Sequence, residues 1–194
     1  MSVAAIVLAA GASRRLGHPK QLVKVNGETL VKRTIRLAEE AGAAPVMVVL
    51  GAHRETICAS VQFGDAIAIV NGNWEQGLAT SIRAGMEAVD AASATIDGVL
   101  LMGCDQPRLT ANHLRSLIEA FELNSTPTIV ASAYAGVHGV PAVFPRNTFA
   151  SLRSLGGDKG ARVLLEESEC PTIALPFEGG EVDIDFPEDI AQLK

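Results

Sequence analysis

Basic side chains and a glycine turn come together in the segment LAAGASRRLGHPKQL at residues 8–22. Backbone N–H groups at residues 10–12 can face a ligand, and Arg14, Arg15 and Lys20 can reach phosphate oxygens. The spacing fits neither the P-loop nor the dinucleotide-binding glycine pattern. On these residues alone, a phosphate-binding loop and a plain turn with solvated arginines are about equally good interpretations.

Aspartates occur at two further points, one after a strand-like run and one before a possible last helix. LLMGCDQP places Asp105 directly after an apolar run, and VDIDFPEDI places Asp183 and Asp185 before Pro187, which can open a helix. Carboxylate oxygens are ligands that Mg²⁺ takes beside substrate phosphates. Isolated Asp-x-Pro sequences are usually turns, so a metal role for Asp105 depends on other residues meeting it. Two separated aspartates and a basic loop at one edge would form a metal-assisted phosphoryl or nucleotidyl transfer site.

Small polar residues follow another strand-like run in NGNWEQGLATSI, at residues 71–82. Asn71, Gly77 and Ser81 could contact a ribose or a base. For this segment alone, the better interpretation is a strand-to-helix loop in which Thr80 or Ser81 caps the helix. A nucleoside contact here therefore depends on the neighbouring motifs.

Two later segments could bind a second anion or a substrate. GGDKGAR contains Lys159 and Arg162, and its Asp158 is most simply the N-cap of a following helix. His138 lies in GVHGVP, where the flanking glycines make it a candidate for a substrate loop. The histidines show no metal-binding spacing.

Composition narrows the class of protein. The chain has 194 residues, 48% of them hydrophobic, and a formal net charge of −6. A negative net charge argues against a nucleic-acid partner, because duplex binding requires a basic face. The 3 cysteines are widely spaced and indicate neither a disulfide framework nor a zinc site. The first apolar run is too short for a membrane span and lacks the basic start of a signal peptide, so we expect no membrane partner and a cytoplasmic location.

The elements that must position these side chains follow an alternating pattern. Apolar runs typical of strands buried on both faces occur at residues 3–9, 46–50, 66–70, 98–102 and 128–132. Helical patterns occur at residues 29–42, 53–62, 80–91 and after Thr110. This alternation predicts an α/β fold, a mainly parallel sheet with helices on both faces, which binds ligands at the carboxyl ends of its strands. The irregular part after residue 133 should pack onto the sheet as an extension of one domain.

The motifs together resemble the molybdenum cofactor cytidylyltransferases and the related guanylyltransferases. Six segments occur in that family's order: LAAGASRRLGHPKQL, NGNWEQGLATSI, LLMGCDQP, HGVPAVFP, LGGDKGAR and DIDFPED. The resemblance implies a Rossmann-like nucleotidyltransferase fold, with residues 1–194 as a single domain. It implies transfer of CMP from CTP to the terminal phosphate of molybdenum-bearing molybdopterin, with Mg²⁺ or Mn²⁺ as the cofactor. A molybdenum hydroxylase or its chaperone would be a transient partner.

The resemblance also implies roles for individual residues. Lys20, Arg15 and Asp105 would be catalytic, and Asp105 and Asp185 would bind the metal. The implied nucleotide contacts are Leu8, Ala9, Ala10, Gly11, Arg15, Lys20, Ser81 and Asp105. The implied contacts to the acceptor are His138, Gly157, Asp158, Lys159 and Arg162. An acceptor phosphate is already a nucleophile, so positioning and charge neutralisation can supply most of the acceleration.

The choice of CTP depends on Ala10. The related guanylyltransferases usually have Leu-Ala-Gly-Gly where this chain has Leu-Ala-Ala-Gly, and glycine lets the backbone approach a bulkier purine. One methyl group can confer about 1–3 kcal/mol of discrimination. The alternatives are GTP as substrate, another acceptor such as a sugar phosphate, or a non-catalytic carrier of the finished cofactor. Lys20, Asp105 and Asp185 favour catalysis, because a carrier needs no triphosphate and metal groups.

Phe186 departs from the family, which commonly has Thr there as the N-cap of the last helix. Loss of such a cap costs about 1 kcal/mol of helix stability. We expect Phe186 to pack against the sheet or a neighbouring loop. If Asp185 served as the replacement cap, it would be lost to the metal site.

Overall fold

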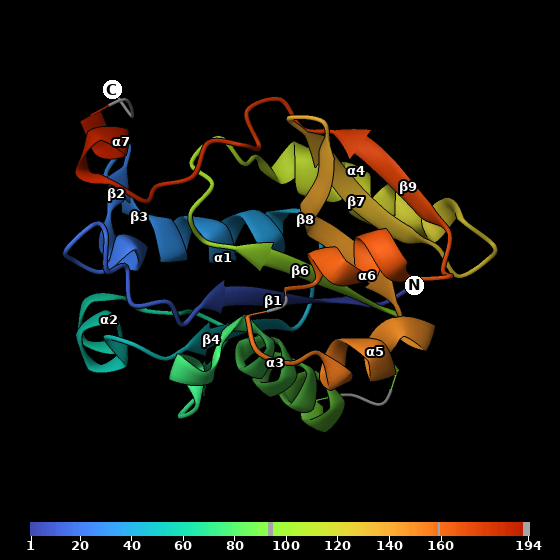
Figure 1. The fold of residues 1–194 in the computed structure, drawn as a ribbon, viewed down its shortest axis with the longest axis horizontal. Coiled ribbons are helices and arrows are strands. Elements are labelled where there is room, and N and C mark those ends of the chain that lie inside the picture. The colour runs from blue at the N-terminus through green and yellow to red at the C-terminus, as the bar shows by residue number, and fades with distance from the viewer. Residues whose placement is uncertain (93–94, 159, 192–194) are drawn as a thin grey trace.

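A seven-stranded sheet organises the computed structural model, which describes residues 1–92, 95–158 and 160–191 (Figure 1). Its strands are β1 Val3–Ala9, β4 Val46–Leu50, β5 Ile67–Val70, β6 Gly98–Gly103, β7 Ile129–Tyr134, β8 Val137–Pro145 and β9 Thr172–Pro176. Their order across the sheet is β5-β4-β1-β6-β8-β7-β9. β8 runs antiparallel to both of its neighbours, and the other pairs are parallel. The predicted fold class, a mainly parallel sheet, is therefore confirmed.

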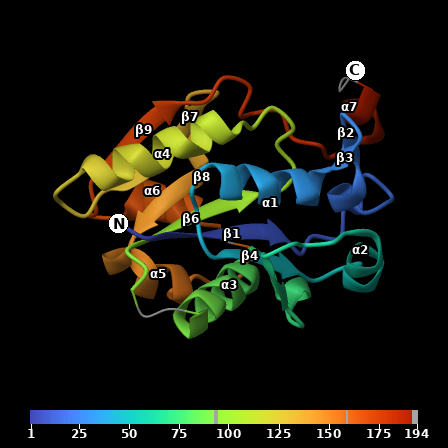
Figure 2. The same cartoon turned by 180° about the vertical axis from the view of Figure 1, so that it is seen from behind.

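Helices cover both faces of the sheet, as two opposite views show (Figure 1 and Figure 2). One face carries α1 Leu30–Glu40, α2 Arg54–Ser60 and α4 Ala111–Leu123; the other carries α3 Leu78–Ala92, α5 Phe149–Ser154 and α6 Arg162–Glu167. Ala5 and Val7 of β1 pack with the first group, whereas Ala4 and Ile6 pack with the second. This double burial explains the continuous apolar run of β1. Within the described residues, no helix is long and apolar enough to cross a membrane.

A small apolar cluster joins the loop after β1 to the C-terminal segment. The short elements there are the 3-10 helix η1 Lys20–Leu22, the antiparallel pair β2 Lys24–Val25 and β3 Glu28–Thr29, and α7 Pro187–Ala191. Leu16, Val23 and Leu30 pack around Ile184, and Ile190 of α7 packs against them. Figure 1 shows α7 beside β2 and β3. Segments from opposite ends of the sequence thus meet at one side of the sheet.

The C-terminal third of the chain departs from the predicted pattern. β7 and β8 form a hairpin that lies within the sheet, and β9 adds an edge strand beyond β7. Two further short 3-10 helices, η2 Trp74–Gln76 and η3 Arg146–Thr148, lie outside the predicted elements. His138 lies in β8 opposite Ala133, so its assignment to a loop is wrong. Backbone pairing with β7 accounts for the strand despite the two glycines that flank His138.

Helix starts agree only in part with the predictions. Thr110 caps α4 as predicted, since its Oγ1 accepts a hydrogen bond from the His113 N–H at 3.2 Å. Thr80 and Ser81 are not caps, because α3 begins before them. Asp158 is not a cap either, because α6 begins well beyond it and has no side-chain cap.

Candidate functional site

The backbone of the loop after β1 is held in place through its carbonyl groups. All four backbone carbonyl groups of residues 9–12 are engaged by other parts of the protein. Gln21 Nε2 donates to the first and third of them at 2.8 and 2.9 Å. The Ala52 N–H donates to the second at 3.0 Å, and His53 Nε2 lies 3.1 Å from the fourth. With its carbonyl groups occupied, the loop can offer hydrogen-bond donors to an anion.

Lys20 is the centre of an ion-pair cluster. Its Nζ lies 2.9 Å from Asp105 Oδ2 and 2.8 Å from Asp185 Oδ1. Asp185 also accepts a hydrogen bond from Arg15 Nη2 at 2.5 Å. Burial by itself lowers the pKa of Lys20, but the attraction of the two carboxylates outweighs burial and raises the pKa above its ordinary value. Lys20 therefore remains a cation that joins two acidic segments distant in sequence.

A cavity of about 640 Å³ opens at the carboxyl ends of β1 and β6. The predicted site residues that line it are Leu8, Ala9, Ala10, Gly11, Lys20, Ser81, Asp105 and Asp158. The predicted residues outside the lining are Arg15, Asp185, His138, Gly157 and Arg162, whereas Lys159 lies outside the described residues. Of these, Arg15 and Asp185 belong to the ion-pair cluster around Lys20, and Arg162 pairs with Glu166 at 2.8 Å.

The lining also includes residues to which the resemblance assigns no role, among them Arg14, Trp74, Gln106, Tyr134 and Asp183. Arg14 is adjacent to Arg15 in the sequence, and Gln106 is adjacent to Asp105, so both could have been proposed as site residues from the motifs. Tyr134 offered none, because it reaches the cavity only through the pairing of β7 with β8.

Asp183 has the most perturbed carboxyl group of the cavity. Asp183 is an exposed residue, but partial burial around its carboxyl group raises its pKa, and the nearby negative charge of Asp105 adds to the effect, so that the pKa reaches about 7. Asp183 lies two residues before Asp185 in VDIDF, and this spacing could have indicated that Asp183 also belongs to the site.

Ser81 is held in place by Asn71. Asn71 Nδ2 donates to Ser81 Oγ at 3.0 Å and to Thr80 Oγ1 at 2.9 Å. Asn71 Oδ1 accepts a hydrogen bond from the Asn73 N–H at 2.9 Å, which fixes the orientation of the amide. Because Ser81 Oγ already accepts a hydrogen bond, its own hydrogen is free to point into the cavity that it lines.

Two glycines bring neighbouring loops of the site together. Gly77 has a φ of 108°, and a Cβ there would collide with the backbone of Gly157. The Ala79 N–H donates to the Gly157 carbonyl at 3.1 Å. Gly77 thus permits the loop before α3 to contact the loop that carries Asp158.

Phe186 contacts the basic loop, as its departure from the family suggested. The guanidinium carbon of Arg15 lies 5.0 Å from the centroid of the Phe186 ring. Asp189 supplies the missing cap, since its Oδ2 accepts hydrogen bonds from the N–H groups of Asp185 and Phe186 at 2.9 and 2.7 Å. The Asp185 carboxylate is therefore free to face Lys20.

The acidic groups fit a divalent cation that shares its ligands with a substrate. Asp105 and Asp185 present hard oxygen donors, which Mg²⁺ and Mn²⁺ prefer. Within residues 1–92, 95–158 and 160–191, no three histidine, cysteine, aspartate or glutamate side chains form a metal-binding group. Two carboxylates suit an ion such as Mg²⁺, which takes further ligands from phosphate and water.

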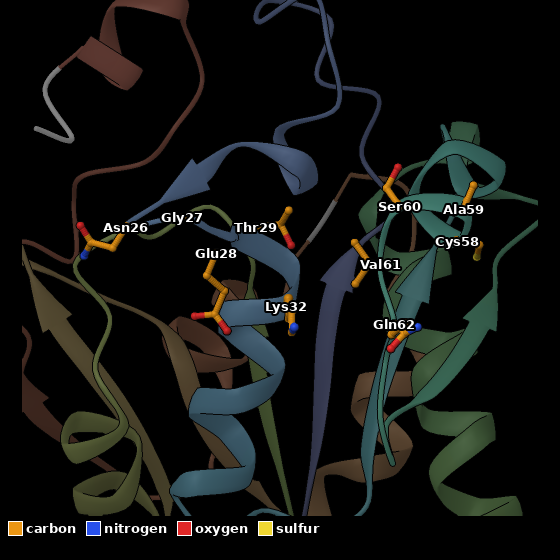
Figure 3. Close-up of a pocket in the computed structure, with 10 residues that line it drawn as sticks. All are labelled: Asn26, Gly27, Glu28, Thr29, Lys32, Cys58, Ala59, Ser60, Val61 and Gln62. Carbon is orange, nitrogen blue, oxygen red and sulfur yellow. The ribbon is translucent and has the colours of Figure 1, made fainter.

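A second hollow, of about 820 Å³, lies between the start of α1 and the end of α2 (Figure 3). Glu28 and Lys32 line one side, and Cys58 and Gln62 line the other. Glu28 is already paired with Arg36 at 2.7 Å. The lining includes neither the basic loop nor a member of the ion-pair cluster, so the chemistry of the site belongs to the smaller cavity.

Residues 5–172 match the model of the family described as the MobA-like NTP transferase domain. The chain belongs to this family. The match confirms the resemblance stated from the six motifs.

Two curated relatives carry different names. The nicotine blue oxidoreductase of Paenarthrobacter nicotinovorans is 32% identical over 174 residues, which cover 85% of this chain and 82% of that protein. A probable molybdenum cofactor guanylyltransferase of Opitutus terrae is 30% identical over 184 residues, which cover 91% of this chain and 86% of that protein. Relatives at this level of similarity are thus named for more than one activity.

A solved structure matches the whole chain. Rv0371c of Mycobacterium tuberculosis H37Rv has a TM-score of 0.85 and 30% identity, over 100% of this chain and 97% of that one. A complex of Rv0371c with manganese has a TM-score of 0.80 and 27% identity, over 100% of this chain and 98% of that one. The Rossmann-like nucleotidyltransferase fold is therefore confirmed.

Proposed function

We propose that this MobA-like chain transfers CMP from CTP to the terminal phosphate of molybdopterin in a Mg²⁺-dependent reaction. The observation that carries the proposal is the meeting of Lys20 with Asp105 and Asp185 at the cavity below the basic loop. Cations and N–H donors suit a triphosphate, and carboxylates suit the metal that accompanies it. The name of the Opitutus terrae relative supports a molybdenum cofactor as the acceptor.

The basic loop would bind the triphosphate. Lys20, Arg14 and residues 10–12 line the cavity, and the backbone N–H groups of this loop would donate to phosphate oxygens. The Arg15 side chain is 63% exposed, so it can exchange Asp185 for a phosphate oxygen without a change in the fold. Ser81 would donate its hydroxyl hydrogen to the nucleoside. The phosphate of the acceptor then needs only alignment with the α-phosphate, because it requires no general base.

Asp105 and Asp185 would hold the divalent cation. A bound Mg²⁺ or Mn²⁺ neutralises negative charge on the phosphates. The manganese complex of the relative Rv0371c supports a divalent ion in this role. Titration of Mg²⁺ against activity in Asp185→Asn tests the assignment, and an unchanged Mg²⁺ dependence and rate would remove Asp185 from the metal site.

Ala10 supports CTP over GTP. Ala10 and Trp74 both line the cavity, and a Cβ at Gly51 would lie 2.6 Å from the Trp74 Cβ and 2.9 Å from the Ala10 Cβ. A methyl group in this wall reduces the space for a purine. The guanylyltransferase name of one relative supports GTP instead, so nucleotide choice is the first property to measure.

Pyrophosphate release separates the candidate functions. It is measured with each of the four nucleoside triphosphates, with and without molybdenum-bearing molybdopterin or a sugar phosphate. Release from CTP that requires the molybdenum cofactor supports the proposal. Release from GTP, or with a sugar phosphate, would change the substrate, and tight binding of the finished dinucleotide without any release would indicate a carrier.

A further inference from the structure

The peptide bond between Ala12 and Ser13 lies in the loop that the proposed function assigns to the triphosphate. Both residues line the cavity. Among the described residues, the Ser13 N–H has no hydrogen-bond acceptor, so it is free to bind a ligand. A trans peptide is planar, and its carbonyl and N–H groups point in opposite directions. The direction of the Ala12 carbonyl therefore determines the direction in which the Ser13 N–H can donate.

Ser13 has an uncommon backbone conformation. Its φ is 51°, in the left-handed region where the Cβ of a non-glycine residue crowds the backbone. Half a turn of the preceding peptide plane would bring this φ to a negative value, because such a rotation changes only the ψ of Ala12 and the φ of Ser13. The Ser13 carbonyl accepts hydrogen bonds from the Leu16 and Gly17 N–H groups, both at 3.1 Å. Its Oγ accepts one from the Lys20 N–H at 3.0 Å. None of these three bonds fixes the peptide that precedes Ser13.

His53 supplies the contact that holds this peptide. It is the N-cap residue of α2, but its side chain makes no cap hydrogen bond to that helix. Its ring reaches the loop after β1 instead, where Nε2 lies 3.1 Å from the Ala12 carbonyl oxygen. Because a carbonyl oxygen only accepts, Nε2 must carry the hydrogen of this bond. The Ala12 carbonyl thus points toward His53, which does not line the cavity, and the Ser13 N–H points the opposite way.

The backbone before His53 braces the same loop. The Ala52 N–H donates to the Ala10 carbonyl at 3.0 Å, and a Cβ at Gly51 would lie 2.9 Å from the Ala10 Cβ. The connection from β4 to α2 therefore runs directly beside the loop, and His53 extends the contact to Ala12. His53 itself has a left-handed φ of 58°. Strained residues persist only where the surrounding structure holds them, and they cluster at functional sites.

We propose that His53 is a positioning residue for the triphosphate: its Nε2–H holds the Ala12–Ser13 peptide so that the Ser13 N–H donates to a phosphate oxygen. The inference rests on the proposed function, which places the triphosphate at this loop. His53 acts through the backbone and does not touch the nucleotide. Without its ring, the peptide turns to relieve Ser13, and a carbonyl oxygen replaces the donor. The affinity for a triphosphate then falls with the fraction of molecules that keep the binding orientation.

The test is the affinity of the full chain for CTP and for tripolyphosphate, each with Mg²⁺, measured by calorimetry. His53→Gly removes the ring, and glycine adopts the left-handed φ without strain. We expect this variant to bind both ligands about three- to tenfold more weakly, by the same factor. In pyrophosphate release, KM for CTP should rise by that factor while kcat stays nearly unchanged.

Two further variants show whether the hydrogen bond is responsible. His53→Gln places an N–H near the position of Nε2 and should recover most of the affinity. His18→Gly is the control, because His18 is an exposed histidine of the same loop that does not line the cavity; its affinity should be nearly unchanged. If His53→Gly does not fold, His53→Asn replaces it, since asparagine tolerates the left-handed conformation and its amide is too short to reach Ala12.

Three results would overturn the role of His53: unchanged CTP affinity in the folded glycine or asparagine variant, an equal loss in His18→Gly, or no recovery in His53→Gln. A loss with CTP but not with tripolyphosphate would also contradict it, because the peptide is assigned to the phosphates. The two levels of inference can be distinguished. Unchanged affinity in His53→Gly together with cofactor-dependent pyrophosphate release from CTP contradicts the role of His53 alone, whereas absence of CTP binding by the unaltered chain contradicts the proposed function as well.

Discussion

Lys20 determines both the charge and the geometry of the candidate site. Asp105 and Asp185 each lie within 3 Å of its Nζ, at 2.9 and 2.8 Å. Without the ammonium group, two carboxylates would face each other and repel. When a metal ion binds these two carboxylates, the Lys20 ammonium group becomes available to a triphosphate. One side chain therefore prepares the site for both of its anionic components.

Replacement of Lys20 should abolish turnover without unfolding the protein. We expect Lys20→Ala to lower kcat by about 10²–10³-fold, the usual effect of removing a group that stabilises developing negative charge. Lys24→Ala is a suitable control, because Lys24 is an exposed residue of the neighbouring β2. Rates of pyrophosphate release, with circular dichroism as the check on folding, decide the matter. A near-normal rate in Lys20→Ala would exclude Lys20 from the chemistry.

Ala10→Gly should shift nucleotide preference toward GTP. Removal of one methyl group from the wall beside Trp74 makes room for a purine, and the shift should correspond to about 1–3 kcal/mol in the ratio of kcat/KM values. Ala12→Gly, in the same loop, adds comparable backbone freedom and removes a different methyl group from the cavity lining. Competition between CTP and GTP measures the ratio directly. If both variants shift it equally, the methyl group of Ala10 is not the determinant.

At the scale of elements, strands and helices with a continuous apolar run or a clear periodicity could be predicted from the sequence. Strands whose position depends on pairing with a neighbour could not. β1 and β4 are buried on both faces, so their composition alone identifies them. β8 contains Pro141, which has no N–H for a ladder, and its place between β6 and β7 depends on antiparallel pairing with both. β9 has only half-buried and exposed positions, in no regular alternation, and this weak pattern gives little signal.

The candidate site shows the same limit. The motifs supplied Lys20, Asp105 and Asp185 as separate groups in three different segments. Their contacts span 85 and 165 residues of sequence, and no local spacing encodes such distances. Tyr134 and the orientation of Gln106 depend on the β7–β8 hairpin, which the sequence did not reveal. A motif could thus indicate a residue of the site, whereas the residues that it contacts could be identified only from the fold.

Asp189→Ala should weaken metal use through the start of α7. Asp189 Oδ2 binds the N–H groups of Asp185 and Phe186, so its loss should cost about 1 kcal/mol of stability, the usual effect of a lost cap. It should also raise the Mg²⁺ concentration needed for half-maximal activity, because Asp185 loses its fixed backbone. Glu188→Ala, at the neighbouring exposed position, serves as the control. An unchanged Mg²⁺ requirement in Asp189→Ala would mean that the cap does not position Asp185.

At the scale of the whole molecule, the site depends on segments from both ends of the chain. The apolar cluster around Ile184 ties the loop after β1 to the segment before α7. The ion pairs from Lys20 and Arg15 to Asp185 join the same two segments. A ligand that binds both segments should therefore stabilise the entire fold rather than one loop.

CTP with Mg²⁺ should raise the melting temperature. At a ligand concentration of about 100 times Kd, binding adds about 2.7 kcal/mol to the free energy of unfolding. For a chain of this size, that corresponds to roughly 5–11 °C. Differential scanning fluorimetry checks the shift, and Lys20→Ala should show little of it. An equal shift in Lys20→Ala would place the nucleotide elsewhere.

The separation of Lys20 and Asp185 in the sequence also determines when the site is complete during synthesis. The two residues are 165 positions apart, and a ribosome adds about 5–20 residues per second. The loop that carries Lys20 is thus made roughly ten to thirty seconds before its second carboxylate partner. All seven strands of the sheet precede Asp185 in the chain, so a nascent molecule gains its ion-pair cluster only after the whole sheet has been made.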